Sequence, residues 1–296
     1  MKIEQVAYKG WEHCVRILID DVELIVTTDV GPRVIHCGFK GGENLFYEDP
    51  KQLGTTGGDA WKIYGGHRFW CAPEDDAYTY AVDNFPVKVH ESGSAISFIA
   101  PPETFGVQKT ITIQPSTHKG RISVTHSVMN TSDRALHIAP WGLTVMRQRS
   151  IAIMPHDLGY SFQYLPTHSF SIWSYSRVAD PRLTMGDRYI ILRQDPTATT
   201  PEKIGSQNPY GWAAGWTEGQ LFIKYFPFDN SAAYPDLNVN NEIYANPDIL
   251  EIETLGPLRD VKPGETIDHL EEWALYRDVP EPVDEATIDS HILPLT

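Results

Sequence analysis

The sequence contains little cysteine. Its 296 residues include three cysteines, Cys14, Cys37 and Cys71, at wide spacing and without a Cys-x-x-Cys pair. An odd number of such isolated thiols gives no sign of a structural zinc site or a redox motif. We therefore expect free cysteines and a protein of a reducing compartment.

Long hydrophobic runs and excess positive charge are also lacking. No stretch approaches eighteen apolar residues, and residues 1–5 carry an acid and no apolar signal segment. The chain has 24 Lys and Arg against 39 Asp and Glu, a formal net charge of −15. This balance disfavours nucleic acid and anionic membranes as partners. We expect a cytoplasmic protein with no nucleic-acid or membrane partner.

Helical periodicity is scarce, and alternation of apolar and polar residues dominates instead. Such alternation, rich in β-branched residues, is typical of β-strands. Strands are predicted at 15–19, 22–27, 95–99, 107–113, 122–128, 136–146, 189–192, 221–226, 250–255 and 269–276. Short helical turns are predicted only near 50–53 and 284–288. With 22 prolines and 22 glycines to make turns, the sequence indicates an all-β fold, one domain over residues 1–296 whose large sheets pack face to face.

A dense motif, YGGHRFWCAPE, occupies residues 64–74. Its glycines allow a ligand to approach the backbone closely, and the indole of Trp70 could stack on a sugar ring. Arg68 and Glu74 offer forked hydrogen bonds to hydroxyl groups. The motif therefore suggests sugar recognition. The alternative is a strand-to-loop corner in which Trp70 belongs to the core and His67 is a satisfied polar residue.

Two glutamates lie two positions apart in the predicted strand at 250–255. Glu251 and Glu253 therefore project from one face of the strand, opposite to Leu250 and Ile252. Like charges at this separation raise one another's pKa, which can supply a carboxylate able to accept a proton near neutrality. The alternative is an ordinary solvated strand face.

The order of these motifs resembles the galactose mutarotase-like superfamily. The resemblance rests on GGHRFWxAPE at 65–74, PWGLTVM at 140–146, ExETLxPL at 251–258 and PGExxxHxExW at 263–273, and covers roughly residues 10–277. More narrowly, the chain is similar to a bacterial branch of the DUF4380 type. The resemblance implies a β-supersandwich whose concave sheet binds a small carbohydrate and acts without a cofactor or metal, as mutarotases and hexose-phosphate epimerases do.

The resemblance also implies roles for particular residues. Glu253 matches the general base of such enzymes, with Glu251 as second choice, and Arg68 matches an arginine that anchors a sugar hydroxyl or carboxylate. Trp141 stands near the position where those enzymes carry their catalytic histidine. His67 or His126 could replace that acid, although a single histidine in a β protein is more often structural.

The remaining candidates are less specific. Lys224, on an apolar strand, either extends to an edge or projects into the cavity toward a carboxylate. The segment around Asp236 and Asn240 could coordinate calcium, but an Asx-type turn network is the stronger interpretation. Three functions stay open: an aldose, hexose-phosphate or uronate 1-epimerase, a non-catalytic sugar-binding protein, and a lyase or hydrolase of oligosaccharides.

Overall fold

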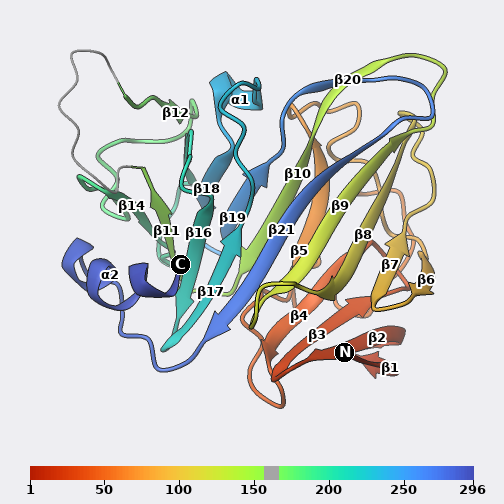
Figure 1. Cartoon of the computed structure of the whole chain (residues 1–296), viewed down its shortest axis with the longest axis horizontal. Helices are drawn as coiled ribbons and strands as arrows, with labels where there is room; N and C mark the ends of the chain where they lie inside the picture. Colours follow the sequence, from red (N-terminus) through yellow and green to blue (C-terminus); the bar gives the residue numbers. More distant parts are fainter. Residues whose placement is uncertain (157–166) are drawn as a thin grey trace.

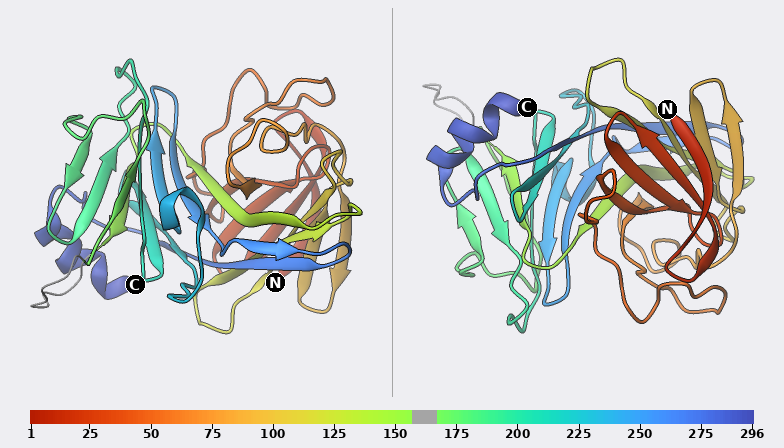
Figure 2. Two further views of the ribbon diagram at one scale, coloured as in Figure 1. Left: turned by 90° about the horizontal axis from the view of Figure 1, so that it is seen from above. Right: turned by 90° about the horizontal axis from the view of Figure 1, so that it is seen from below.

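The computed structural model of the chain describes residues 1–156 and 167–296. It consists almost entirely of two large antiparallel sheets, which confirms the predicted all-β class. In Figure 1 the long strands β21, β9 and β8 run side by side across the centre of the molecule. Figure 2 shows the N-terminal strands and the strands between residues 180 and 220 on opposite sides of the molecule.

The first sheet has eleven strands and carries the central strands of the candidate site. Its order is β1 (Lys2–Tyr8), β2 (Trp11–Ile19), β3 (Val22–Thr27), β4 (Arg33–Phe39), β5 (His67–Ala72), β10 (Leu136–Met146), β19 (Leu250–Leu255), β18 (Asn241–Ala245), β15 (Glu202–Ser206) and β12 (Phe170–Ile172), while β20 (Arg259–Val261) pairs with β10. Segments far apart in the sequence thus become neighbours in the middle of this sheet.

The second sheet has ten strands. Its order is β13 (Leu183–Met185), β14 (Tyr189–Arg193), β11 (Ile151–Pro155), β16 (Trp212–Thr217), β17 (Gln220–Tyr225), β21 (Thr266–Tyr276), β9 (Ile122–Asn130), β8 (Val107–Pro115), β7 (Ala95–Ile99) and β6 (Lys88–Ser92). Helical structure in the described chain is limited to α1 (Pro235–Asn238), α2 (Glu285–His291) and the 3-10 turn η1 (Leu293–Leu295). The predicted strands at 136–146 and 250–255 agree with β10 and β19 residue for residue.

The main core lies between the two sheets and follows from the alternation of side chains. In β19, Leu250 and Ile252 join this core, while Glu251 and Glu253 project from the other face. The core includes residues from Val15 in β2 to Leu275 in β21. Cys14, Cys37 and Cys71 are all buried and free, as expected.

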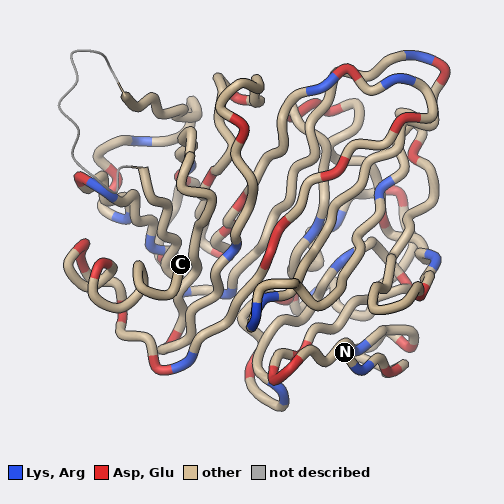
Figure 3. Tube along the Cα trace, viewed as in Figure 1, with Lys and Arg blue, Asp and Glu red and all other residues tan. Residues whose placement is uncertain are grey.

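The charged residues are spread over the chain rather than gathered on one element. Figure 3 shows acidic positions on both halves of the molecule, in loops and within strands. Across residues 1–156 and 167–296, no helix is long and apolar enough to cross a membrane.

Candidate functional site

The candidate site is built on the outward face of three central strands, β5, β10 and β19. The strand register places Leu143 of β10 opposite Arg68 on one side and opposite Glu253 on the other. In an antiparallel sheet, directly paired residues project from the same face. The motif at 64–74 and the glutamate pair in 250–255 therefore meet on one surface. Arg68 and Glu251, for example, are 183 residues apart in the sequence.

This surface forms the floor of a cavity of about 360 Å³. Six residues that the sequence singled out line it together: Arg68, Trp70, Glu74, Trp141, Glu251 and Glu253. Trp61, Tyr80, Tyr175 and Tyr244 add further aromatic walls, and Lys203 adds a second cation. Such a mixture of aromatic surface and a few buried charged groups is typical of a small-molecule binding site.

Glu253 is the most strongly anchored carboxylate of the cavity. Its Oε2 accepts hydrogen bonds from the indole Nε1 of Trp141, at 2.9 Å, and from the ammonium Nζ of Lys203, at 3.0 Å. Its Oε1 is buried and has no hydrogen-bond partner among the described residues. Buried polar atoms are rarely left unpaired in native proteins, so this oxygen is a natural place for a bound water or a ligand hydroxyl.

Lys203 lies on β15, between two carboxyl groups. Its Nζ is 2.6 Å from Glu242 and 3.0 Å from Glu253, and it lies over the rings of Trp141 and Trp173 at 4.9 Å and 4.5 Å from their centroids. Burial lowers the pKa of Lys203, but the carboxylates of Glu242 and Glu253 outweigh burial and hold its pKa well above the ordinary value. Lys203 is therefore charged at neutral pH.

Sequence reasoning missed both Lys203 and Glu242 as site residues. Lys203 belongs to a short strand with no motif of its own. Glu242 lies in the oxygen-rich segment that was considered for calcium, and its pairing with Glu253 across β18 and β19 was not visible in the sequence. The strand of Lys203, EKIGS, is of mixed polarity, so no sequence signal marked this lysine.

Arg68 and Glu251 form the second charged pair of the cavity. Nη2 of Arg68 donates to Oε1 of Glu251 at 2.8 Å, and the guanidinium lies 4.4 Å from the ring centroid of Trp70. Nε and Nη1 of Arg68 have no hydrogen-bond partner in the described chain. Burial raises the pKa of Glu251, Arg68 opposes this effect, and Glu253 adds to it. The net result is a pKa of Glu251 above the ordinary value of a glutamate.

His67, His126 and Lys224, by contrast, do not reach the cavity. His67 precedes Arg68 on β5, so its side chain points to the opposite face, between the two sheets. His126 of β9 and Lys224 of β17 project into the same interior from the second sheet and are fully buried. The expectation that a histidine lies beside Glu253, and that Lys224 enters the sugar cavity, is corrected by this strand alternation.

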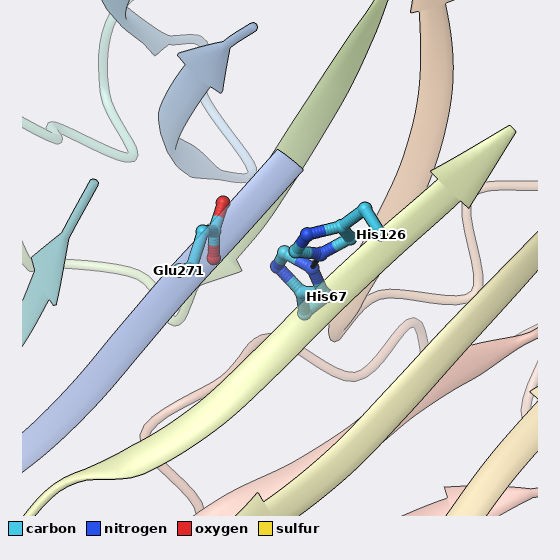
Figure 4. A group of neighbouring side chains, drawn as sticks. All are labelled: His67, His126 and Glu271. Carbon is cyan, nitrogen blue, oxygen red and sulfur yellow. Dashed lines mark hydrogen bonds between the residues drawn. The ribbon is translucent and has the colours of Figure 1, made fainter. Parts of the chain in front are cut away.

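These three residues belong instead to an interior network around Glu271 of β21. The Nε2 atoms of His67 and His126 are 2.6 Å apart, and Figure 4 shows their rings close together with Glu271 to one side. Lys224 donates to Glu271 at 2.8 Å and to the carbonyl oxygens of Gly142 and Ile252, both at 3.2 Å. All three ammonium protons of Lys224 therefore have acceptors.

The proton positions in this network can be assigned without contradiction. Nδ1 of His126 can only donate to the carbonyl oxygen of His269, so its Nε2 accepts from Nε2 of His67. Nδ1 of His67 then accepts from the hydroxyl of Thr144. Burial lowers the pKa of both His67 and His126, which keeps them neutral.

The same group has the composition of a metal site. Ligand atoms of His67, His126 and Glu271 lie within 4.8 Å of one another. However, Thr254, Lys224 and Trp273 already donate to the Glu271 carboxylate. Two imidazole ligands of a tetrahedral zinc ion would also lie more than about 3 Å apart, since each Zn–N bond is about 2 Å. The residues fit a closed hydrogen-bond network better than a metal centre.

The segment considered for calcium forms a turn network. The side chain of Asn238 accepts from the backbone N–H of Tyr234 at 3.0 Å. Asn240 is fully buried, where its side chain accepts from the backbone of Asn208 and donates back to it. These bonds use the amide oxygens that a calcium ion would need, in agreement with the Asx-type interpretation.

Comparisons with solved structures identify the fold. The chain superposes on the Slr1438 protein from Synechocystis sp. PCC 6803 with a TM-score of 0.59 and 10% identity, over 94% of this chain and 99% of that one. A galactose mutarotase-like protein from Lactobacillus casei ATCC 334 superposes with a TM-score of 0.57 and 12% identity, over 89% of this chain and 100% of that one. A Klebsiella pneumoniae protein provisionally named aldose 1-epimerase superposes with a TM-score of 0.60 and 12% identity, over 97% of this chain and 85% of that one.

The chain thus has the galactose mutarotase-like fold, and the predicted β-supersandwich is confirmed. At identities of 10–12% these matches establish the fold and not the activity. No protein-family model and no curated sequence matches the chain. The narrower resemblance to the DUF4380 type stays a prediction.

Proposed function

We propose that the protein binds a small carbohydrate in the cavity of β5, β10 and β19 and catalyses exchange at its anomeric carbon, as an aldose 1-epimerase does. The observation that carries the proposal is the position of Glu251 and Glu253 on one strand face, in a cavity that the indoles of Trp70 and Trp141 also line. Indole faces stack on sugar rings, and carboxylates move protons on hydroxyl groups. The fold, shared with galactose mutarotase-like proteins, supports this assignment as analogy.

Ring opening needs a base at the anomeric hydroxyl and an acid at the ring oxygen, and ring closure on the other face of the carbonyl exchanges the anomers. We assign the base to Glu253, whose Oε1 is unpaired while Lys203 and Trp141 hold Oε2. We assign the acid to Glu251, because burial and its neighbour Glu253 raise its pKa. Two carboxyl groups with different surroundings can divide the two roles between them.

Nuclear magnetic resonance of the two anomers tests this proposal. Saturation transfer between α and β signals should be faster with the protein than in buffer for at least one of glucose, galactose, their 6-phosphates and galacturonate. Glu253→Gln should abolish the acceleration while sugar binding persists, because the amide keeps the shape but is no base. Full activity in this variant would remove Glu253 from the mechanism.

A non-catalytic sugar-binding protein is the second candidate. It is favoured by one observation: no histidine is among the residues that line the cavity in the described chain. This candidate predicts saturable binding without faster anomer exchange. Exchange above the uncatalysed rate would count against it.

A further inference from the structure

A second, larger cavity adjoins the carboxylate cavity. Its volume is about 510 Å³, and Trp70 and Tyr80 line both cavities. Tyr80 packs edge-on against the ring of Trp70, with centroids 5.3 Å apart, and its hydroxyl donates to Glu74 of the carboxylate cavity. The side chains of Trp70 and Tyr80 therefore form a rim that the two adjacent cavities share.

The second cavity exists because the first sheet is interrupted between β4 and β5. These strands pair at one position, Val34 with His67. Continuing that register would place Pro32 opposite Phe69, but proline has no N–H to donate to a sheet ladder. The backbone N–H of Gly31 donates instead to the carbonyl oxygen of Asp83, at 2.8 Å. The strands thus separate where Gly31, Pro32 and Trp70 border the cavity.

Part of the wall of this cavity is apolar and includes exposed aromatic surface. Val82, Phe85, Pro101 and Pro102 contribute to them. Phe85 is 48% exposed and gives the cavity an accessible aromatic surface. A flat aromatic wall suits the C–H face of a sugar ring.

Two of the carboxylates that line the cavity take part in ion pairs, and each has one unpaired oxygen. The polar lining as a whole comprises Asp59, Asp76, Asp83, Glu103, Thr104 and Lys109. Lys109 contacts Glu103 at 2.8 Å, and Arg33 contacts Asp83 at 2.7 Å. Oε2 of Glu103 and Oδ1 of Asp83 are buried without a hydrogen-bond partner among residues 1–156 and 167–296. Unpaired carboxylate oxygens accept from hydroxyl groups, which an alkyl chain or a lipid cannot supply.

We infer that this cavity binds a second sugar ring, so that the substrate class is a reducing disaccharide or the reducing end of an oligosaccharide. The reducing ring occupies the carboxylate cavity and the next ring lies beyond Tyr80, against Phe85. The inference rests on the proposed function, because it extends the same site. It distinguishes this protein from one that handles free monosaccharides alone.

Binding measurements by calorimetry test the inference with glucose, galactose, maltose, cellobiose and lactose. We expect at least one disaccharide to bind about tenfold more tightly than the monosaccharide at its reducing end, since an added aromatic contact is worth about one factor of ten. Equal affinity for both sizes would overturn the inference and leave the proposed function intact. Binding of neither size would overturn the proposed function as well. Octyl glucoside binding more tightly than every disaccharide would also overturn the inference.

Two variants locate the second ring. Phe85→Ala removes the exposed aromatic wall, and Ala77→Trp fills the same cavity from an exposed position. Each should weaken disaccharide binding about tenfold while monosaccharide binding changes less than about twofold. Tyr210→Ala, an exposed aromatic outside both cavities, is the matched control and should change neither. If the ratio of disaccharide affinity to monosaccharide affinity is the same in both variants as in the wild-type protein, the inference is overturned.

Discussion

At the scale of single residues, the indole of Trp141 illustrates how one side chain can serve two purposes. Its ring is a wall of the carboxylate cavity, and its Nε1 donates to Oε2 of Glu253. The resemblance to mutarotases placed Trp141 where those enzymes have a histidine. Here the indole cannot transfer a proton, but it orients the carboxylate that we assign as the base.

The two purposes can be separated by substitution. Trp141→Phe keeps an aromatic wall and removes the N–H, so kcat for anomer exchange should fall about tenfold or more, because a hydrogen bond to a charged group is worth about 1.5–3 kcal/mol. The affinity for sugar should change much less. NMR exchange rates and calorimetry on the same samples measure the two quantities.

Trp70→Phe is the matched control for this prediction. Trp70 lines the same cavity, and the hydrogen bonds that hold Glu253 come from Trp141 and Lys203. The same change at Trp70 should therefore affect binding rather than kcat. Equal losses of kcat at both positions would show that the indole N–H of Trp141 has no special role.

At the scale of strands, the interior network holds together the elements that carry the cavity. Lys224 of β17 donates to the carbonyl oxygens of Ile252 and Gly142, which lie on β19 and β10. Ile252 lies between the two cavity glutamates in sequence. A buried ion pair on one face of the sheet thus positions the backbone of the residues that project from the other face.

Breaking this pair should strongly destabilise the protein. Lys224→Met leaves the Glu271 carboxylate buried without its counter-charge. Burial raises the pKa of Glu271, and the Lys224 ammonium is the largest of the nearby influences that hold this pKa well below its ordinary value. We expect the free energy of unfolding in urea to fall by about 3–5 kcal/mol. The double variant with Glu271→Gln should recover part of this loss, because no buried charge is then left unpaired.

An exposed lysine provides the matched control. Lys2→Met removes the partner of Glu4 at the surface, where a salt bridge contributes little to stability because solvent screens it. A loss at Lys224 no larger than that at Lys2 would contradict the role assigned to the interior network.

The strands show how far the sequence could be interpreted. Period-two alternation predicted β10 and β19 to the residue and correctly placed Glu251 and Glu253 on the face opposite Leu250. Alternation does not indicate which face of a strand is turned toward the core. Both His67 and Arg68 were therefore assigned to the sugar site from the sequence, although neighbouring residues on a strand project from opposite faces. Lys203 and Glu242 could not be found, because their role depends on the pairing of β15, β18 and β19.

At the scale of the whole molecule, burial of histidines between and beside the sheets makes stability depend on pH. Burial, and then the nearby charges of Arg16 and Lys9, lower the pKa of His36 from 6.5 to about 4. Burial likewise lowers the pKa of His269 to about 3. The unfolded chain therefore binds protons that the folded protein does not between these values and pH 6.5.

The direction of the effect follows from proton linkage. The free energy of unfolding rises with pH wherever the unfolded state binds more protons. The contribution of each histidine to stability is therefore fully present above pH 6.5. It is lost as the pH falls toward 4 for His36 and toward 3 for His269. For His36 alone, the difference in pKa corresponds to about 3 kcal/mol. Because acidic residues also titrate below pH 5, the histidine effect is best isolated by substitution.

His36→Gln isolates it, because glutamine can still form a hydrogen bond with Tyr8 but does not titrate. The decrease in the free energy of unfolding between pH 7 and pH 4.5, measured in urea, should be smaller in this variant than in the wild-type protein by about 2 kcal/mol, since each pKa unit is worth about 1.4 kcal/mol. His90→Gln, at an exposed position on the edge strand β6, should leave the decrease unchanged. Equal decreases in all three proteins would show that His36 titrates normally in the folded state, and that its burial beside Tyr8 is not maintained in solution.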